Sequence, residues 1–255
     1  MSLFIASLNS GSNGNCYYIG NQQEAVLIDA GISCRETERR MERIGLSLKK
    51  VKAIFISHEH TDHTRGVEVI AKKYKLPVYI TPDTHRNSRL RVNQKQLNPF
   101  FAYTPVHVGA LRINAFPKWH DAAEPHSFTV SDNGITIGVF TDLGIACEHV
   151  VEHFKQCNAA FLESNYDEKM LEEGSYPYYL KQRIRGVNGH LSNEQALELF
   201  TNHRSSSLSH LLLSHLSEYN NKPELVHDLF SKNAGGSHIA IASRHLESEV
   251  FCITG

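Results

Sequence analysis

Cysteine and long apolar runs are scarce in this sequence of 255 residues, and each shortage excludes a class of protein. The five cysteines lie far apart and form no CxxC pair, which argues for reduced thiols and against a disulfide framework. No window approaches the roughly 20 consecutive apolar residues of a membrane span, and the N-terminus lacks the basic and apolar regions of a signal peptide. We therefore expect a cytoplasmic protein without a membrane segment.

An excess of charge of either sign is also missing, because 26 Lys and Arg face 27 Asp and Glu. No overall cationic field attracts a polyanion, so any affinity for nucleic acid has to come from local patches. Two stretches mix cations with polar or aromatic residues: Arg86, Arg89, Arg91 and Lys95 in the first, and Tyr176, Tyr178, Tyr179, Lys181, Arg183 and Arg185 in the second. Each is a candidate contact for nucleic acid, although such runs are more often solvated faces.

The length suits one domain spanning residues 1–255, and the hydrophobic pattern predicts its elements. Strands are predicted at 3–8, 16–20, 25–31, 51–57, 78–80, 111–116, 127–132, 135–140, 159–163 and 210–214, and helices at 34–44, 67–74, 150–156 and 193–201. Asn133-Gly134 is a strong hairpin signal between two of these strands. Strands that alternate with helices indicate the α/β class, with two sheets and helices outside them.

Histidine is abundant, with 16 residues, and imidazole is the commonest metal ligand in proteins. Four ligand-type residues, His58, His60, Asp62 and His63, follow directly after a predicted buried strand. The first two can point at one metal from an extended segment, and the last two can point at a neighbouring metal from a turn. An exposed histidine-rich loop is the alternative, but it would need neither the apolar strand before the motif nor the helix after it.

The string HEHTDH resembles the HxHxDH signature of the metallo-β-lactamase superfamily. The segments VLIDAG, WHDA, FTDLG, FLESNYD, NGHLSN and LLLSHLS follow in the order that this superfamily uses, and with GSNGNC near the start they resemble its YycJ/WalJ-like single-domain subgroup. The resemblance implies an α/β fold that is a four-layer αββα sandwich. The stretch before His215 is too short for a β-CASP insertion, so we expect a site without that lid.

The resemblance also implies a ligand set for two divalent transition-metal ions. His58, His60 and His120 would hold one ion, Asp62, His63 and His215 the other, and Asp142 would bridge them. Two neighbouring cations need an anionic ligand between them, which a carboxylate supplies. Zinc is the first candidate, and manganese, iron, cobalt and nickel stay open. Zinc β-lactamases commonly have cysteine where Asp142 stands, which argues against antibiotic hydrolysis.

Further residues carry expected roles around these ligands. By resemblance to members that cleave phosphodiesters, His190 would protonate the leaving oxygen and Glu163 would orient it, although His190 could also merely precede a helix N-cap at Ser192 or Asn193. Asp29 would orient the histidine loop by hydrogen bonds, with a plain turn-capping aspartate as the alternative. Ser12 and Asn15 belong to a glycine-rich turn that either binds substrate phosphate or only joins two strands.

These expectations describe a dinuclear metal-dependent hydrolase, a phosphodiesterase or exonuclease acting on DNA or RNA. A hydroxide between the metals would attack phosphorus, with Asp62 as proton acceptor and His190 as donor. A hydrolase of a small phosphodiester or thioester is one alternative, and a non-catalytic metal-binding module is another. A polymer needs an open groove and a small ester a closed pocket. The sequence leaves the oligomeric state open.

Overall fold

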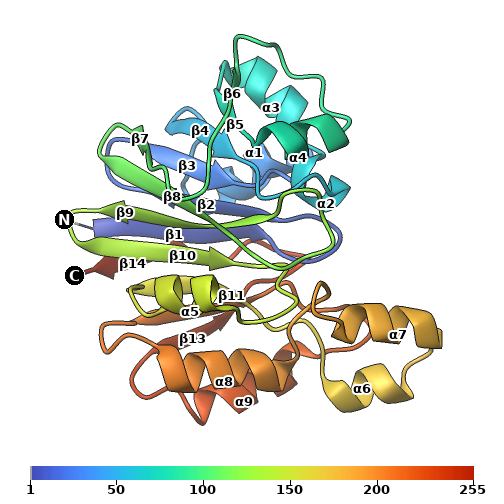
Figure 1. The fold of residues 1–255 in the computed structure, drawn as a ribbon. Helices are drawn as coiled ribbons and strands as arrows, with labels where there is room; N and C mark the ends of the chain where they lie inside the picture. Colours follow the sequence, from blue (N-terminus) through green and yellow to red (C-terminus); the bar gives the residue numbers. More distant parts are fainter. Residues whose placement is uncertain (1) are drawn as a thin grey trace.

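The computed structural model describes residues 2–255, in which two seven-stranded sheets pack face to face (Figure 1). The first sheet has the order β14-β1-β2-β3-β4-β5-β6 and the second the order β13-β12-β11-β10-β9-β8-β7. Their strands are β1 (Ser2–Asn9), β2 (Cys16–Gly20), β3 (Ala25–Ile28), β4 (Val51–Phe55), β5 (Val78–Tyr79), β6 (Leu97–Asn98), β7 (Val106–Val108), β8 (Leu111–Pro117), β9 (His126–Asp132), β10 (Ile135–Phe140), β11 (Ala159–Glu163), β12 (His210–Ser214), β13 (His238–Ile241) and β14 (Phe251–Thr254).

Each sheet is antiparallel on one side and parallel on the other. The pairs β3–β4, β4–β5 and β5–β6 are parallel in the first sheet, and β10–β11, β11–β12 and β12–β13 are parallel in the second. The parallel strands β3, β11 and β12 are runs of apolar residues buried along almost their whole length, as expected for strands covered on both faces. Aromatic rings fill the space between the sheets, where the centroids of Tyr17 and Phe161 lie 4.8 Å apart.

Helices cover both outer faces of the sandwich. They are α1 (Cys34–Arg43), α2 (Thr61–Thr64), α3 (Val67–Tyr74), α4 (Pro82–Asn87), α5 (Glu148–Phe154), α6 (Glu168–Glu173), α7 (Tyr178–Arg185), α8 (Asn193–His203) and α9 (Pro223–Ser231). Met41 of α1 and Ile70 of α3 pack on the first sheet, while Phe154, Phe200 and Phe230 of α5, α8 and α9 pack on the second. The layers are thus α, β, β and α, which confirms the predicted fold class (Figure 1).

The predicted elements are found with small shifts of their ends. Helix α3 has the predicted bounds, and Asn133 and Gly134 have φ angles of 48° and 81°, as a tight hairpin between β9 and β10 requires. The turn predicted at Asp62 and His63 is wrong, because these residues lie in the one-turn helix α2. Between β10 and β12 the described chain forms only α5, β11, α6, α7 and α8, so no β-CASP insertion is present there.

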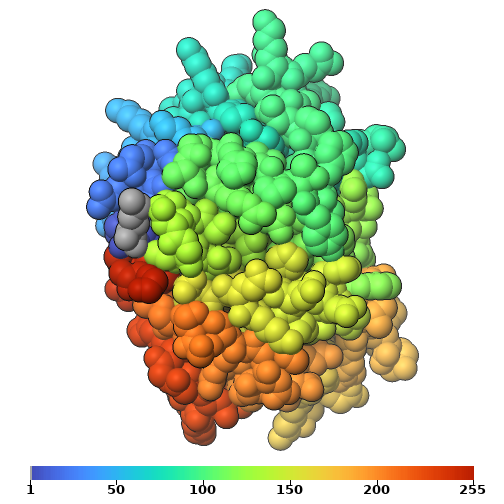
Figure 2. All heavy atoms as spheres, turned by 60° about the vertical axis from the view of Figure 1, so that its left-hand side comes forward, coloured from blue at the N-terminus to red at the C-terminus, as the bar shows by residue number. Residues whose placement is uncertain are grey.

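The chain ends and the ligand-bearing loops lie on different sides of the sandwich. In Figure 1, β14 lies at the left and α2 and α7 at the right. The turned view of Figure 2 shows β14, in red, beside the blue first strands, in agreement with their antiparallel pairing. All five cysteines are free thiols, and Cys252 of β14 is exposed. Within residues 2–255, no helix has the length and apolar character to cross a membrane.

Candidate metal centre

The ligand-type residues follow the ends of strands from both sheets. His58 comes after β4, His120 after β8, Asp142 after β10 and His215 directly after β12. Asp29, Asp142 and His215 have left-handed φ angles of 59°, 55° and 55°. Non-glycine residues rarely adopt this conformation, and such strain gathers at functional sites where the surrounding structure holds it. The sharp turns that these residues make direct their side chains to one edge of the sandwich.

Backbone contacts fix the motif loop against the loops before β2 and after β3. The amide of Asn15 donates to the carbonyl of Asp62 (2.7 Å), and the amide of Ala30 donates to the carbonyl of His63 (2.9 Å). A Cβ atom at Gly31 would lie 1.6 Å from the carbonyl oxygen of Asp62. Only glycine therefore permits this approach, which explains its place in the segment VLIDAG.

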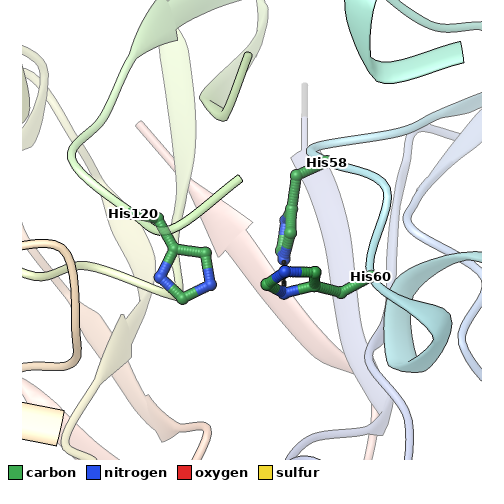
Figure 3. A group of neighbouring side chains, drawn as sticks. All are labelled: His58, His60 and His120. Carbon is green, nitrogen blue, oxygen red and sulfur yellow. Dashed lines mark hydrogen bonds between the residues drawn. The ribbon is translucent and has the colours of Figure 1, made fainter. Parts of the chain in front are cut away.

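Three histidines form a candidate site for one metal ion, named the first ligand set: His58, His60 and His120. Figure 3 shows their rings facing one another across a small space, with Nε2 of His58 and Nδ1 of His60 only 3.0 Å apart. One nitrogen from each of the three rings lies within 4.8 Å of the others. Tetrahedral metal sites are commonly built from three such nitrogens and an open position.

Asp62, His63 and His215 form the second ligand set, and their ligand atoms also lie within 4.8 Å of one another. Asp142 stands between the two sets. Its Oδ1 lies 3.8 Å from Nε2 of His120 and 3.4 Å from Nε2 of His215, while its Oδ2 lies 3.2 Å from Nε2 of His63. The carboxylate therefore reaches both sets, as a bridging ligand does.

The two sets differ in their affinity for protons. Burial lowers the pKa of His58 well below its usual value and that of His120 to about 4. Burial also opposes protonation of His63 and His215, but Asp142 and other nearby carboxylates outweigh it, raising the pKa of His215 to about 10 and that of His63 well above its usual value. At neutral pH the second set thus carries positive charge that a metal ion would replace.

The donor atoms fit bound cations. Nε2 of His120, Nε2 of His215 and Oδ2 of Asp142 are buried and make no hydrogen bond of acceptable geometry within residues 2–255. Imidazole nitrogens and carboxylate oxygens are the ligands that divalent transition metals accept, so a metal ion would satisfy all three atoms.

Asp29 holds one histidine of each ligand set by hydrogen bonds, His63 directly and His58 through Ser57. Its fully buried carboxylate accepts from Nδ1 of His63 (2.7 Å) and from the hydroxyl of Ser57 (2.8 Å). Because the Ser57 hydroxyl donates to Asp29, it can only accept from Nδ1 of His58, which lies 2.9 Å away. Both rings are therefore held at Nδ1, which turns Nε2 toward the site, as hydrogen bonds to the second ring nitrogen of a ligand usually do.

Glu163 links the second ligand set to His190. One oxygen, Oε1, lies 2.8 Å from Nδ1 of His190 and 3.0 Å from Nδ1 of His215, and the other accepts from the amide of Leu143 (2.6 Å). Burial opposes ionisation of Glu163, but its histidine partners lower its pKa to about 2. Ser192 does cap α8 in a capping box with Gln195, so the GHLSN segment contains both a helix start and a histidine directed at the centre.

Two cavities adjoin residues of the centre. The His190 cavity, of about 190 Å³, is lined by His190, Ser12, Asp121, Asn165, Tyr176 and Arg183 among others. The His60 cavity, of about 560 Å³, is lined by His60, Thr61, Arg65 and Arg89 among others. Ser12 thus lies near the centre, and Asn15 donates from Nδ2 to Oδ2 of Asp62 (3.2 Å).

The two basic stretches are partly neutralised. Arg86 pairs with Asp83, Arg183 with Asp121, and Arg185 with both Glu168 and Glu172. Arg183 and Tyr176 nevertheless line the His190 cavity and Arg89 lines the His60 cavity, so each stretch contributes to one cavity.

Lys118 was not identified from the sequence. Its ammonium group donates to the carbonyl of Thr141 (2.7 Å), next to Asp142, and burial lowers the pKa of Lys118. A lysine two residues before His120 has no local pattern that predicts burial. Asn165, which donates to the carbonyl of His215 (2.7 Å), also gave no sequence signal, because that contact joins separate loops.

Comparisons with known proteins agree with this geometry. Residues 24–215 match the sequence profile of the beta-lactamase superfamily domain. Exodeoxyribonuclease YycJ of Bacillus anthracis is 34% identical over 228 residues, which cover 88% of this chain and 86% of that protein. Exodeoxyribonuclease WalJ of Streptococcus pneumoniae is 32% identical over 225 residues, covering 86% of this chain and 84% of that protein. The metallo-beta-lactamase fold protein YhfI of Bacillus subtilis superposes with a TM-score of 0.72 over 99% of this chain and 100% of that one, at 14% identity, which shows a common fold.

Proposed function

Because this chain belongs to the metallo-β-lactamase superfamily and is YycJ/WalJ-like, we propose that it is a metal-dependent phosphodiesterase that removes nucleotides from DNA. The first ligand set would hold one divalent ion and the second ligand set another, with Asp142 between them. Two such ions would act as Lewis acids and lower the pKa of water to about 7. Zinc is the leading metal, with manganese, iron, cobalt and nickel as alternatives.

Two side chains of this protein would transfer the protons of the reaction, Asp62 as the acceptor and His190 as the donor. Asp62, whose Oδ2 accepts from Asn15, accepts a proton from the attacking water as the new P–O bond forms. His190 gives a proton to the leaving oxygen as the other P–O bond breaks. The products are a phosphate monoester and an alcohol. Glu163 holds Nδ1 of His190 and leaves Nε2 available to the leaving oxygen.

The observation that carries this proposal is the shared oxygen of Glu163. By accepting from both His190 and His215, it fixes the proton donor relative to the second ligand set. A metal-binding module without catalysis would not need a partly exposed histidine held in this way. The cavities at His190 and His60 support an elongated substrate that passes the centre, more than a small ester enclosed in one pocket.

An activity screen tests the proposed function. Protein reconstituted with zinc or manganese is incubated with end-labelled single-stranded and double-stranded DNA, with matching RNA, and with bis(p-nitrophenyl) phosphate. We expect stepwise loss of nucleotides from DNA ends, abolished by a chelator. Cleavage of the small ester alone would support the small-phosphodiester alternative, and bound metal without any turnover would support the non-catalytic module.

Metal binding should release protons, chiefly from the second ligand set. His63 and His215 have raised pKa values and are protonated at pH 7 in the metal-free protein, whereas His58 and His120 are neutral. We expect release of about two protons per chain from these histidines, in addition to the proton of metal-bound water, and an affinity that falls as the pH is lowered. Calorimetric titration at pH 7 in buffers of different ionisation enthalpy measures this release. Binding without proton release would contradict the assignment of His63 and His215.

A further inference from the structure

The His190 cavity has an aromatic wall that the proposed reaction does not use. Tyr176, before α7, lines this cavity together with His190. The ring of Tyr219, in the loop after β12, packs on Tyr176 with centroids 6.1 Å apart and planes at 62°. Tyr219 is 66% exposed, so this pair lies at the surface and not in the core. The contact joins two segments far apart in sequence and fixes an aromatic ring at the edge of the cavity.

One face of α7 completes the wall. Leu180, Arg183 and Ile184 line the cavity, and their spacing of three and four residues places them on the same side of the helix. Figure 1 shows α7 beside the loops at the right-hand edge of the sandwich, outside the layer formed by α8 and α9. Because Arg183 is paired with Asp121, this wall offers apolar and aromatic surface more than free positive charge.

The size of the cavity limits what it can hold. At about 190 Å³, it is smaller than the pockets of roughly 300–1,000 Å³ that enclose a drug-sized ligand. Its volume therefore suits one planar group, such as a single ring system. Polar side chains of Ser12 and Asn165 also line it, so the planar group can carry polar edges.

We propose that Tyr176 is a stacking platform for one unpaired nucleobase next to the scissile phosphodiester, with Tyr219 holding its ring in place. This inference rests on the proposed nuclease function. The ring of His190 lies 5.3 Å from that of His120 and 5.2 Å from that of His215, centroid to centroid, so the cavity adjoins both ligand sets. A nucleotide whose leaving oxygen reaches His190 therefore has room for its base in the same cavity. Every base has a π-face, so such stacking gives affinity without sequence preference.

Substitutions at Tyr176 test the platform in the metal-reconstituted enzyme. Tyr176→Ala should raise KM for an end-labelled single-stranded oligonucleotide roughly 5- to 150-fold, the worth of one base–aromatic stack. Tyr176→Phe keeps the aromatic face and should restore the wild-type KM. The matched control is Phe101→Ala, because Phe101 is 57% exposed, does not line the cavity and lies outside both basic stretches. An equal rise of KM in both Ala variants would overturn the proposal.

Oligonucleotides with one abasic position separate stacking from other effects. A series of oligonucleotides carries the abasic position at increasing distance from the cleaved end. For the wild type, KM should rise at one position in this series. That rise should equal the rise that Tyr176→Ala causes with the intact oligonucleotide. The variant should lose nothing more at that position, because the two changes remove the same contact. Independent, multiplicative losses would overturn the platform while leaving the nuclease function in place. If the wild type removes no nucleotide from any oligonucleotide, the proposed function fails and this inference fails with it.

Discussion

Asp142→Asn is expected to abolish turnover of DNA. It should also weaken binding of the metal pair by roughly 10- to 100-fold or more. An amide cannot supply the negative charge that two neighbouring cations need between them. Asparagine tolerates the left-handed φ of 55° at this position, so the substitution changes the charge without adding backbone strain. Elemental analysis of the reconstituted variant, together with its rate on end-labelled DNA, measures both effects.

A matched control is Asp132→Asn, the same chemical change at the end of β9. Asp132 accepts from Nδ2 of Asn21 (2.9 Å) and belongs to neither ligand set. This variant should keep its metal and its activity. If Asp142→Asn also kept both, Asp142 would not be the bridging ligand.

His190→Ala should leave both metals bound but slow the hydrolysis of DNA by roughly 10²- to 10⁴-fold, the usual contribution of one positioned acid or base. The reason is that neither of the two proposed ligand sets includes His190, although a ring nitrogen of His190 lies within 4.8 Å of ligand atoms of Asp142, Glu163 and His215. A nitrophenyl phosphodiester has a leaving group that departs with little protonation, so its cleavage should fall much less. The ratio of the two rate losses is the quantity to measure. His227→Ala is the control, because His227 is an exposed histidine on α9.

Other outcomes for His190→Ala would assign a different role. Loss of metal would make His190 a ligand and would overturn the proposed division of the site. Equal losses on both substrates would mean that His190 positions the substrate and does not protonate it. With no loss on either substrate, the segment would serve only as the start of α8, through the capping box of Ser192.

Much of the centre could be predicted because its residues follow strands that are themselves easy to predict. His58 and His215 come directly after runs of buried apolar residues, in VKAIFIS and HLLLS. A strand of this kind is held by its sheet on both sides, so the position of the next residue is set by the fold. The dense HEHTDH motif marked the edge at which these strand ends meet.

The missed features depend on contacts that local patterns do not carry. Helix α7 has Pro177 at its N-cap position and no side-chain cap, so its sequence lacks the usual start signal of a helix. Strand β6 has only two residues and exists through pairing with β5. The burial of Lys118 depends on the carbonyl of Thr141, 23 positions further along the chain. Such non-local contacts can be described only once the two sheets are in place.

The most direct test of the account is a metal titration of the metal-free protein, in which the initial rate on end-labelled DNA is followed as zinc or manganese is added. Two ligand sets bridged by Asp142 predict a rate that depends on metal and levels off at about two equivalents per chain. A rate that levels off at one equivalent, or that needs no metal at all, would contradict the proposed dinuclear centre.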